Sequence, residues 1–266
     1  MKILLQNIQS GVNINKGYWQ IPLFFWKYFL PHSQKSIIKI SEYIKYNNID
    51  IAVFTEADAG SIRTNFIDQV SLISRNSGLK NGFFFKTTNI LKITNQGNGI
   101  LTKYRIINNK QYPLPSIGEP RFLCQSTIEI RDETKNKNSK NTLKTKNKIN
   151  DRIKNNEDLL NVFITHLSIS KRNRVKQIEE INNIISKIKG SKILLGDFNI
   201  SSDDELLPLQ NENFKRISFI KTYPSWNPKK CFDNIFLSSN IKKYSISKAD
   251  ILVSDHLGLI LDFDIK

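Results

Sequence analysis

The stretch SKILLGDFNIS at residues 191–201 decides the fold. Its apolar run, bounded by polar residues, predicts a short buried strand. Gly196 lets the backbone bend sharply where that strand ends. Asp197 and Asn199 then lie on one turn at the rim of a sheet, where α/β proteins place their chemistry. Taken alone, the pattern fits a turn that bonds its own backbone at least as well. Its meaning therefore depends on how the other strands end.

Five further segments pair a β-type apolar run with polar residues of the catalytic kind. They are ILLQN at 3–7, IAVFTE at 51–56, VFITH at 162–166, FDNIF at 232–236 and VSDH at 253–256. Taken singly, each polar residue has an ordinary structural explanation. Glu56 fits a salt-bridged strand end, His166 a core histidine, and Asp255 with His256 a cap. The complete set in this order is much harder to explain by chance.

With these residues in place, the sequence resembles the endonuclease/exonuclease/phosphatase superfamily. Its members include DNase-I-like nucleases, abasic-site endonucleases, sphingomyelinases and inositol polyphosphate phosphatases. GDFN and SDH are the most specific motifs, and Glu56, His166 and Asp233 fall where the family pattern requires them. GNGILTKYRI at 97–106 is similar to the family's GNAILS segment. TYPSWNPKKCFDNIFLS at 222–238 is similar to a bacterial subgroup.

The resemblance covers nearly the whole chain and implies a DNase-I-like fold. This is a four-layer α/β sandwich of two facing mixed β-sheets with outer helices, expected here as one domain over residues 1–266. Periodicity alone indicates only an α/β protein. It predicts one helix with Ser33 as N-cap, a second near 62–75, and a third that Gly190 ends as a C-cap. Short β runs, broken by Gly and Pro, fill residues 83–130.

The resemblance also implies a metal-dependent mechanism. Carboxylates with an amide and no thiolate suit a hard divalent ion such as Mg²⁺ or Mn²⁺. By resemblance, Glu56 and Asp255 hold the metal and Asn7 helps to orient them. Asp197 and Asn199 position and deprotonate the attacking water and contact the phosphate.

The remaining roles concern the phosphoryl oxygens. His256, oriented by Asp233, and His166 stabilise these oxygens. Asn98 and Arg121 are candidate phosphate contacts, although a structural role is the favoured explanation for each. Abasic-site endonucleases carry an acid where this chain has Gln9, which puts a second metal ligand from the first strand in doubt.

Length and charge set broader limits. A chain of 266 residues that is 39% hydrophobic can bury one large core. The net charge of +16 favours anionic partners. Residues 131–156 contribute +6 of it and +10 is spread elsewhere, so the charge does not choose among anionic substrates. Residues 131–157 are rich in Lys and Asn with almost nothing apolar, which predicts a disordered insert.

Cysteine usage and the N-terminus indicate the compartment. Cys124 and Cys231 lie in apolar, strand-like contexts without metal-ligand spacing, which predicts free thiols in a reducing environment. The N-terminal apolar run is far shorter than that of a signal peptide. We therefore expect a cytoplasmic protein, acting as a monomer.

The aromatic segment YWQIPLFFWKYFL at residues 18–30 is interrupted by Gln20, Pro22 and Lys27 and is too short to span a membrane. One interpretation is a helix or loop packed over a sheet edge. The other is an aromatic and basic surface that touches a membrane interface or stacks on bases.

The sequence thus predicts a divalent-metal-dependent phosphodiesterase, with nucleic acid as the favoured substrate. The alternative is a phospholipid or phosphoinositide phosphoesterase at a membrane surface. A Ser or Cys hydrolase would need a nucleophile elbow, and the sequence contains no Gly-x-Ser-x-Gly. An inactive polyanion-binding module would lack one of the core carboxylates or histidines, and all are present.

Overall fold

The computed structural model describes residues 1–130 and 158–265. One sheet contains β1 (Lys2–Asn7), β2 (Ile51–Asp58), β3 (Asn81–Ile90), β4 (Thr94–Thr102), β11 (Lys243–Lys248) and β12 (Leu259–Asp264). The other contains β5 (Arg105–Leu114), β6 (Arg121–Glu129), β7 (Leu159–His166), β8 (Ser191–Asp197), β9 (Phe214–Arg216) and β10 (Asp233–Ser238). The strand orders are β11-β12-β1-β2-β4-β3 and β5-β6-β7-β8-β10-β9.

The longer helices are α2 (Lys35–Tyr46), α3 (Gln69–Ser77) and α5 (Lys171–Ser186), and α1 (Gln20–Phe24) is short. Short 3-10 helices are η1 (Gln9–Gly11), η2 (Phe25–Tyr28), η3 (Ile62–Thr64) and η5 (Asp203–Leu209). Both sheets are mixed, because β1–β2 and β7–β8 are parallel pairs while their neighbours pair antiparallel. The crossover helices of these parallel pairs are α2 and α5.

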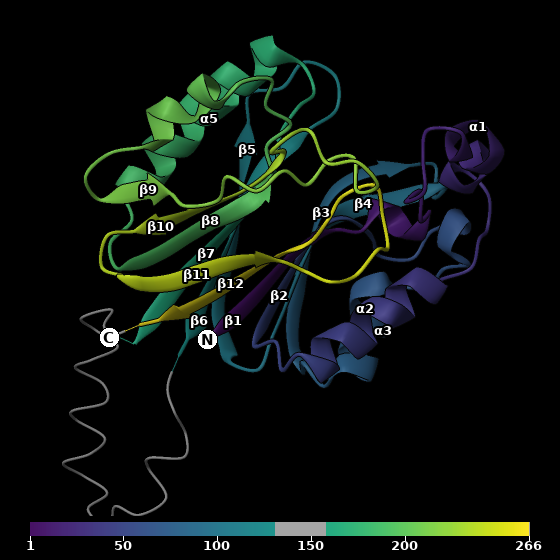
Figure 1. The fold of residues 1–266 in the computed structure, drawn as a ribbon, viewed down its shortest axis with the longest axis horizontal. Helices are drawn as coiled ribbons and strands as arrows, with labels where there is room; N and C mark the ends of the chain where they lie inside the picture. Colours follow the sequence, from purple (N-terminus) through teal and green to yellow (C-terminus); the bar gives the residue numbers. More distant parts are fainter. Residues whose placement is uncertain (131–157, 266) are drawn as a thin grey trace, which may run out of the picture.

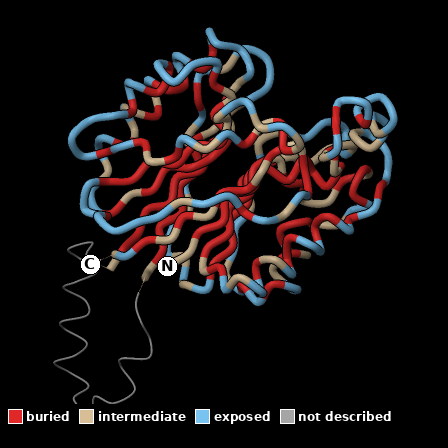
Figure 2. Tube along the Cα trace, in the orientation of Figure 1, coloured by how far each residue is buried: buried red, intermediate tan, exposed pale blue. Residues whose placement is uncertain are grey.

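Alternating side chains explain the layers. Ile3 of β1 and Ile193 of β8 belong to one apolar cluster between the two sheets. Leu4, on the opposite face of β1, packs in the cluster with α2 and α3, and Leu194 packs in the cluster with α5. Three buried interfaces therefore separate four layers, as the sequence resemblance predicted (Figures 1 and 2).

Two helix boundaries differ from the sequence predictions. Helix α2 begins at Lys35, and its N-cap is Gln34 rather than Ser33. The Gln34 side chain accepts a hydrogen bond from Gln69 Nε2 at 2.7 Å, so a tertiary contact to α3 sets this corner. Helix α5 ends at Ser186, and Gly190 is not its C-cap. Gly190 instead takes a φ of 89° immediately before β8, where the left-handed turn favours glycine.

The other two differences concern whole segments. Residues 253–256 form a loop, not a strand. The Ser254 hydroxyl donates to the carbonyl of Asn7 at 2.6 Å and accepts from the amide of His256, which folds the loop onto the end of β1. The helix expected near 62–75 is divided into η3 and α3.

The cysteines, the Lys-rich insert and the question of a membrane span were also addressed from the sequence. Cys124 is buried, Cys231 is half-buried, and both thiols are free. The insert predicted at 131–157 lies outside the described residues. Within the described part of the chain, none of the helices combines the length and the apolar character needed to cross a membrane.

Candidate active site

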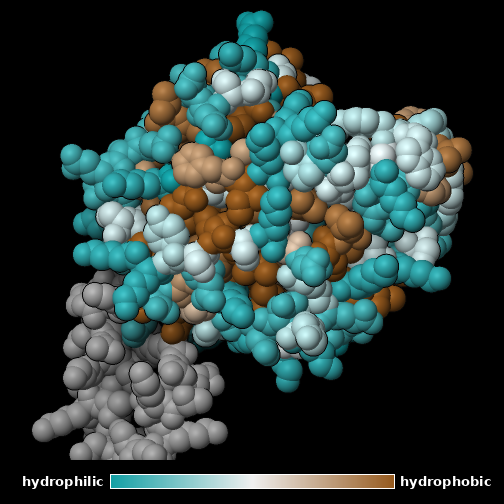
Figure 3. Space-filling model, viewed as in Figure 1, coloured by the Kyte–Doolittle hydropathy of each residue, from teal (hydrophilic) through white to brown (hydrophobic). Residues whose placement is uncertain are grey.

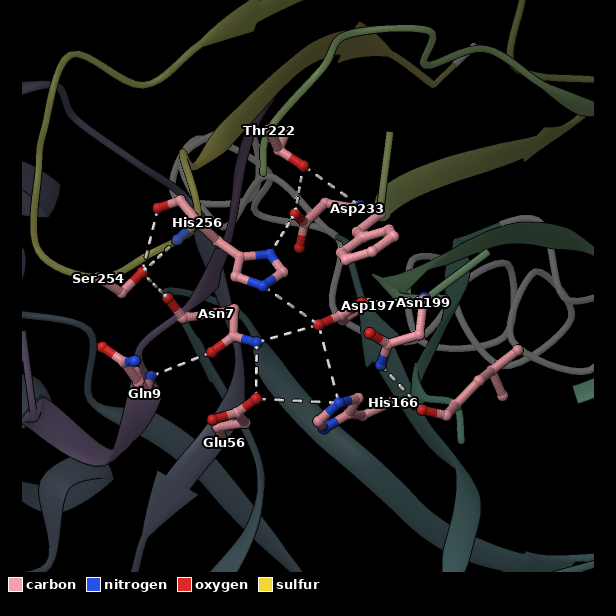
Figure 4. Close-up of polar contacts among 12 residues, drawn as sticks. Asn7, Gln9, Glu56, His166, Asp197, Asn199, Thr222, Asp233, Ser254 and His256 are labelled. Carbon is pink, nitrogen blue, oxygen red and sulfur yellow. Dashed lines mark hydrogen bonds and ion pairs between the residues drawn. The ribbon is translucent and has the colours of Figure 1, made fainter. Parts of the chain in front are cut away.

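Polar side chains from both sheets meet where the parallel strand pairs end. β1 ends at Asn7, β7 at His166 and β8 at Asp197, and Glu56 lies near the end of β2. β10 runs antiparallel to β8 and begins at Asp233, directly opposite Asp197. Figure 4 shows these side chains pointing toward one another. The strand ends that carry the polar residues noted in the sequence therefore converge on one site.

Asp197 lies at the centre of the group and is buried. Its Oδ2 accepts a hydrogen bond from Asn7 Nδ2 at 3.1 Å and lies 3.6 Å from Nε2 of His256 and 3.7 Å from Nε2 of His166. Gly196, at φ 152°, permits this placement, because a Cβ there would lie 1.9 Å from the carbonyl oxygen of Thr165.

Asn199 completes the turn after β8. Its backbone N–H donates to Asp197 Oδ1 at 3.0 Å, and its side-chain amide donates to the carbonyl of Leu167 at 3.0 Å. The structural and the functional interpretations of this turn therefore both apply. One carboxylate oxygen of Asp197 bonds its own backbone, and the other faces the converging side chains.

His256 is oriented by a buried acid. Its Nδ1 lies 2.8 Å from Asp233 Oδ2, and the Thr222 hydroxyl donates to the same oxygen at 2.5 Å. Burial alone would lower the pKa of His256, but the carboxylates of Asp233 and Asp197 raise this pKa well above its ordinary value. His256 is consequently a cation at neutral pH, with Nε2 directed toward Asp197.

His166 is the opposite case. Burial lowers the pKa of its imidazole well below the ordinary value, and the charges of Arg121 and His256 act in the same direction. Its Nε2 lies 3.9 Å from Glu56 Oε1. The site therefore combines one neutral and one cationic histidine, which offer different hydrogen-bonding capacities to a substrate oxygen.

Glu56 is brought to the site by a β-bulge. The register of β2 against β4 shifts between Phe54 and Ala57, and Glu56 takes a φ of 56°. Its Oε1 accepts a hydrogen bond from Asn7 Nδ2 at 3.0 Å. The Ser10 hydroxyl donates to the Glu56 carbonyl at 2.9 Å and fixes the bulge.

Asp255 lies on the wall of the same cavity, which has a volume of about 910 Å³ and also contains Glu56, Asp197, His166 and His256. Burial raises the pKa of Asp255 to about 7, and the carboxylates of Glu56 and Asp197 add to the rise against the opposing effect of His256. Burial likewise raises the pKa of Asp197 to about 6. At neutral pH Asp197 is therefore mostly ionised, whereas Asp255 is only partly ionised.

Among the described residues, two groups have possible ligand atoms within 4.8 Å of one another. They are Glu56, His166 and Asp197, and Asp197, Asp233 and His256. Asp255 belongs to neither group. In the described ranges, no Lys or Arg forms an ion pair with Glu56 or with Asp255. A divalent cation would therefore supply the positive partner charge that these two carboxylates lack. A carboxylate-rich donor set without thiolates suits a hard ion.

The predicted phosphate contacts lie beside this group. Asn98 and Arg121 line a small cavity with Glu56 and His166. Arg121 pairs with Glu119 at 2.5 Å and donates to the carbonyl of His166 at 3.5 Å, while its buried Nε has no hydrogen-bond partner among the residues that the structure describes. Asn98 contacts only the sulfur of Cys124, at 3.8 Å, among its side-chain partners in the described residues.

Gln9 does not face the carboxylates. Its Nε2 donates to the hydroxyl of Tyr28 at 2.9 Å, and its Oε1 accepts from the amide of Ile14 at 3.0 Å. Both polar ends are occupied within the protein. Gln9 therefore does not offer a second metal ligand in this arrangement.

Three residues of the site were not identified from the sequence. Thr222 holds Asp233, the ring of Tyr223 lies 5.0 Å from the ring of His256, and Tyr28 lines the cavity. Burial raises the pKa of Tyr223 to about 12. Thr222 and Tyr223 begin the 222–238 segment, so that motif was an available signal. Nothing in the aromatic stretch distinguishes Tyr28 from its neighbours.

Known proteins share this architecture. A structure of an endonuclease/exonuclease/phosphatase from Beutenbergia cavernae superposes with a TM-score of 0.69 at 15% identity, covering 100% of this chain and 71% of that one. D. rerio TDP2 complexed with single strand DNA product gives 0.64 at 14% identity, with 99% and 98% covered. The mannosyl-6-phosphatase of Bacteroides thetaiotaomicron gives 0.62 at 14% identity, with 100% of both covered.

These likenesses, all at low identity, concern the fold. Among curated proteins there is no match. The model of the endonuclease/exonuclease/phosphatase family matches residues 7–256, nearly the whole chain and every strand end that contributes to the site. The chain therefore belongs to the endonuclease/exonuclease/phosphatase family, whose members hydrolyse phosphoric esters.

Proposed function

We propose that the chain is a divalent-metal-dependent phosphodiesterase that hydrolyses nucleic-acid phosphodiester bonds. The observation that carries the proposal is the placement of Asp197 between Asn7, His166 and His256, opposite Glu56, at the wall of a large polar cavity. This arrangement offers a base, two groups for phosphoryl oxygens, and acids for a cation, as phosphoester cleavage requires.

Each residue has a role that follows from its position. Asp197, with a pKa of about 6, is ionised above that pH and accepts the proton of the attacking water. Asn199 fixes the Asp197 carboxylate through its backbone N–H. His256, held as a cation by Asp233, donates to a phosphoryl oxygen, and the neutral His166 donates a second hydrogen bond.

Glu56 and Asp255 are the residues that would hold Mg²⁺ or Mn²⁺. When bound, such an ion supplies Lewis-acid stabilisation of charge on the phosphate and leaving oxygen. Asn7 orients Glu56 and Asp197 together, because its single amide nitrogen donates to both carboxylates.

Nucleic acid is favoured as substrate by the net charge of +16, most of which lies outside the Lys-rich insert. Arg121 and Lys230 also line the cavity, where they suit a chain of phosphates. A relative of the same fold was solved with a single-strand DNA product. We further propose that the chain acts as a monomer in the cytoplasm, as the sequence predicted.

A second candidate is hydrolysis of a phospholipid headgroup. It is favoured by one observation, the row of exposed apolar side chains at residues 18–30 beside the cavity. Both candidates use the same catalytic residues, so the substrate test must decide between them.

The test is a Mg²⁺-dependent panel with plasmid DNA, single-stranded DNA, RNA and phospholipid vesicles. The proposal expects nicked or shortened nucleic acid with the wild type, and none with Asp197→Asn or after chelation. Intact DNA and RNA together with hydrolysed phospholipid would select the second candidate. Activity in the Asp197→Asn variant would reject the catalytic assignment.

A further inference from the structure

The outer face of residues 18–30, here named the aromatic arm, is the most apolar exposed surface segment of the described chain. It comprises α1, η2 and their flanks, and Figure 1 places α1 at the edge of the molecule. Eight of its large apolar side chains are 39 to 58% exposed: Tyr18, Trp19, Ile21, Leu23, Phe25, Trp26, Phe29 and Leu30. At that edge Figure 3 shows brown and white rather than uniformly teal atoms. Such a concentration marks an interaction site.

The arm is a fixed structure, so its exposure is built into the fold. Gln20 is buried, and its Oε1 accepts hydrogen bonds from the amides of Asn15 and Lys16 at 2.9 and 2.7 Å. Lys27 Nζ donates to the carbonyl of Val12 at 3.2 Å. The polar groups on the inner side are satisfied within the protein, which leaves the apolar side chains outside.

We propose that the aromatic arm docks the protein on an anionic lipid surface. The charge fits this occupant, because residues 1–41 contain no Asp or Glu, while the exposed Lys16 adjoins the arm. The composition fits as well. All three tryptophans of the chain are at the arm: Trp19 and Trp26 are part of it, and Trp226 packs against Tyr18 with ring centroids 5.1 Å apart. Tryptophan is the residue most typical of the membrane interface.

The other occupants fit less well. Base stacking needs open ring faces, whereas Phe25 and Phe29 pack edge to face at 5.4 Å, and Ile21, Leu23 and Leu30 offer no ring. A second copy of the chain would bring together two arms that carry Lys without any acid. Insertion of the exposed aliphatic and aromatic side chains below the headgroups, with the adjoining Lys16 at headgroup level, fits these features.

Docking would also orient the active site. Tyr28, on the inner side of the arm, lines the cavity that contains Glu56, Asp197 and Asp255. The surface around this cavity would then lie close to the lipid headgroups. The inference concerns a surface outside the cavity and holds whichever phosphodiester is cleaved.

The test measures binding without turnover. The full chain, in chelator, is mixed with phosphatidylcholine vesicles with and without phosphatidylglycerol, and sedimentation and tryptophan emission are recorded. We expect binding that phosphatidylglycerol strengthens, together with a blue shift of the emission. Trp19→Ser/Leu23→Ser should lower the vesicle affinity about tenfold or more, because two side chains lose their burial in lipid.

The control is Tyr46→Ser/Leu207→Ser, which removes two exposed apolar side chains elsewhere and should bind as the wild type does. Unfolding midpoints of both variants near that of the wild type confirm that the comparison is fair. The proposal is overturned if vesicles neither bind the chain nor shift its emission. It is also overturned if both variants lose affinity equally, or if the arm variant loses affinity for single-stranded DNA alone.

Discussion

Replacing Asp197 with Asn removes a buried carboxylate while keeping its shape, and this should stabilise the metal-free protein as it abolishes activity. Burial raises the pKa of Asp197 from 3.8 to about 6. Above about pH 6 the Asp197 carboxylate is ionised in both states, but its charge is less stable in the folded chain than in the unfolded chain. A shift of two pKa units lowers the free energy of unfolding by about 3 kcal/mol. In the variant, an amide nitrogen replaces one of the two carboxylate oxygens that accept hydrogen bonds from Asn7 and Asn199. The loss of that hydrogen bond destabilises the folded variant by about 1 kcal/mol. We expect a net gain of about 2 kcal/mol.

The gain must depend on pH, and its direction follows from the raised pKa. A raised carboxyl pKa destabilises the folded chain above that pKa and has no effect below the unfolded value. The stability advantage of Asp197→Asn should thus be present at about pH 8 and fade between about pH 6 and pH 4. Urea unfolding of the metal-free proteins at both pH values measures it, with exposed Asp264→Asn as the control. Equal stability of variant and wild type at about pH 8, or near-wild-type kcat, would refute the reasoning.

Three further outcomes follow from the site. Chelation should abolish hydrolysis until Mg²⁺ or Mn²⁺ is restored, and full activity in excess chelator contradicts this. Glu56→Ala should lower kcat by orders of magnitude with an unchanged unfolding midpoint. Asp233→Asn should lower the pKa of His256, so the alkaline limb of the kcat profile moves to lower pH; an unmoved limb contradicts it. Deleting residues 135–154 should leave the melting temperature within a few degrees and reduce the salt dependence of polyanion binding, because the flanking Ile130 and Asp158 are already joined by a backbone hydrogen bond of 2.9 Å.

The layers and most of the site were predictable because their signals are short-range. An apolar run, a glycine and an acid together predict strand β8 and its turn. Gly196 is required there because the backbone of Thr165 approaches it closely. The helix periodicities likewise identified α2 and α5. The helix ends were not predictable in this way, since Gln34 displaces Ser33 as a cap through its contact with Gln69, thirty-five residues away.

The loop at 253–256 shows the same limit. Val253 and Ser254 have the composition of a strand. In the structure, however, the Ser254 hydroxyl bonds the carbonyl of Asn7 and the amide of His256, two backbone groups that a neighbouring strand would otherwise bond. Asp255 and His256 nevertheless line the cavity, and only the strand expected for their backbone is wrong. Sequence patterns report side-chain chemistry more faithfully than the local path of the chain when a polar side chain replaces a backbone partner.

The bulge that directs Glu56 into the site depends on residues with no sequence signal for it. Non-glycine residues seldom adopt positive φ, because the left-handed region costs about 1 kcal/mol or more. Four such residues surround Asn7 and Asp197: Gln9 at 47°, Ser10 at 48°, Glu56 at 56° and Asn199 at 50°.

A buried ion pair supports this conformation. Arg63 Nη2 donates to the Ser10 hydroxyl at 2.7 Å, and its Nε donates to Asp58 at 2.8 Å, so the pair holds Ser10 against the Glu56 carbonyl. Local preference would straighten β2 and turn Glu56 away from Asn7. Because the surrounding fold imposes the opposite geometry, the positions of the carboxylates proposed as catalytic depend on Arg63 and Asp58 as much as on the motifs that identify them.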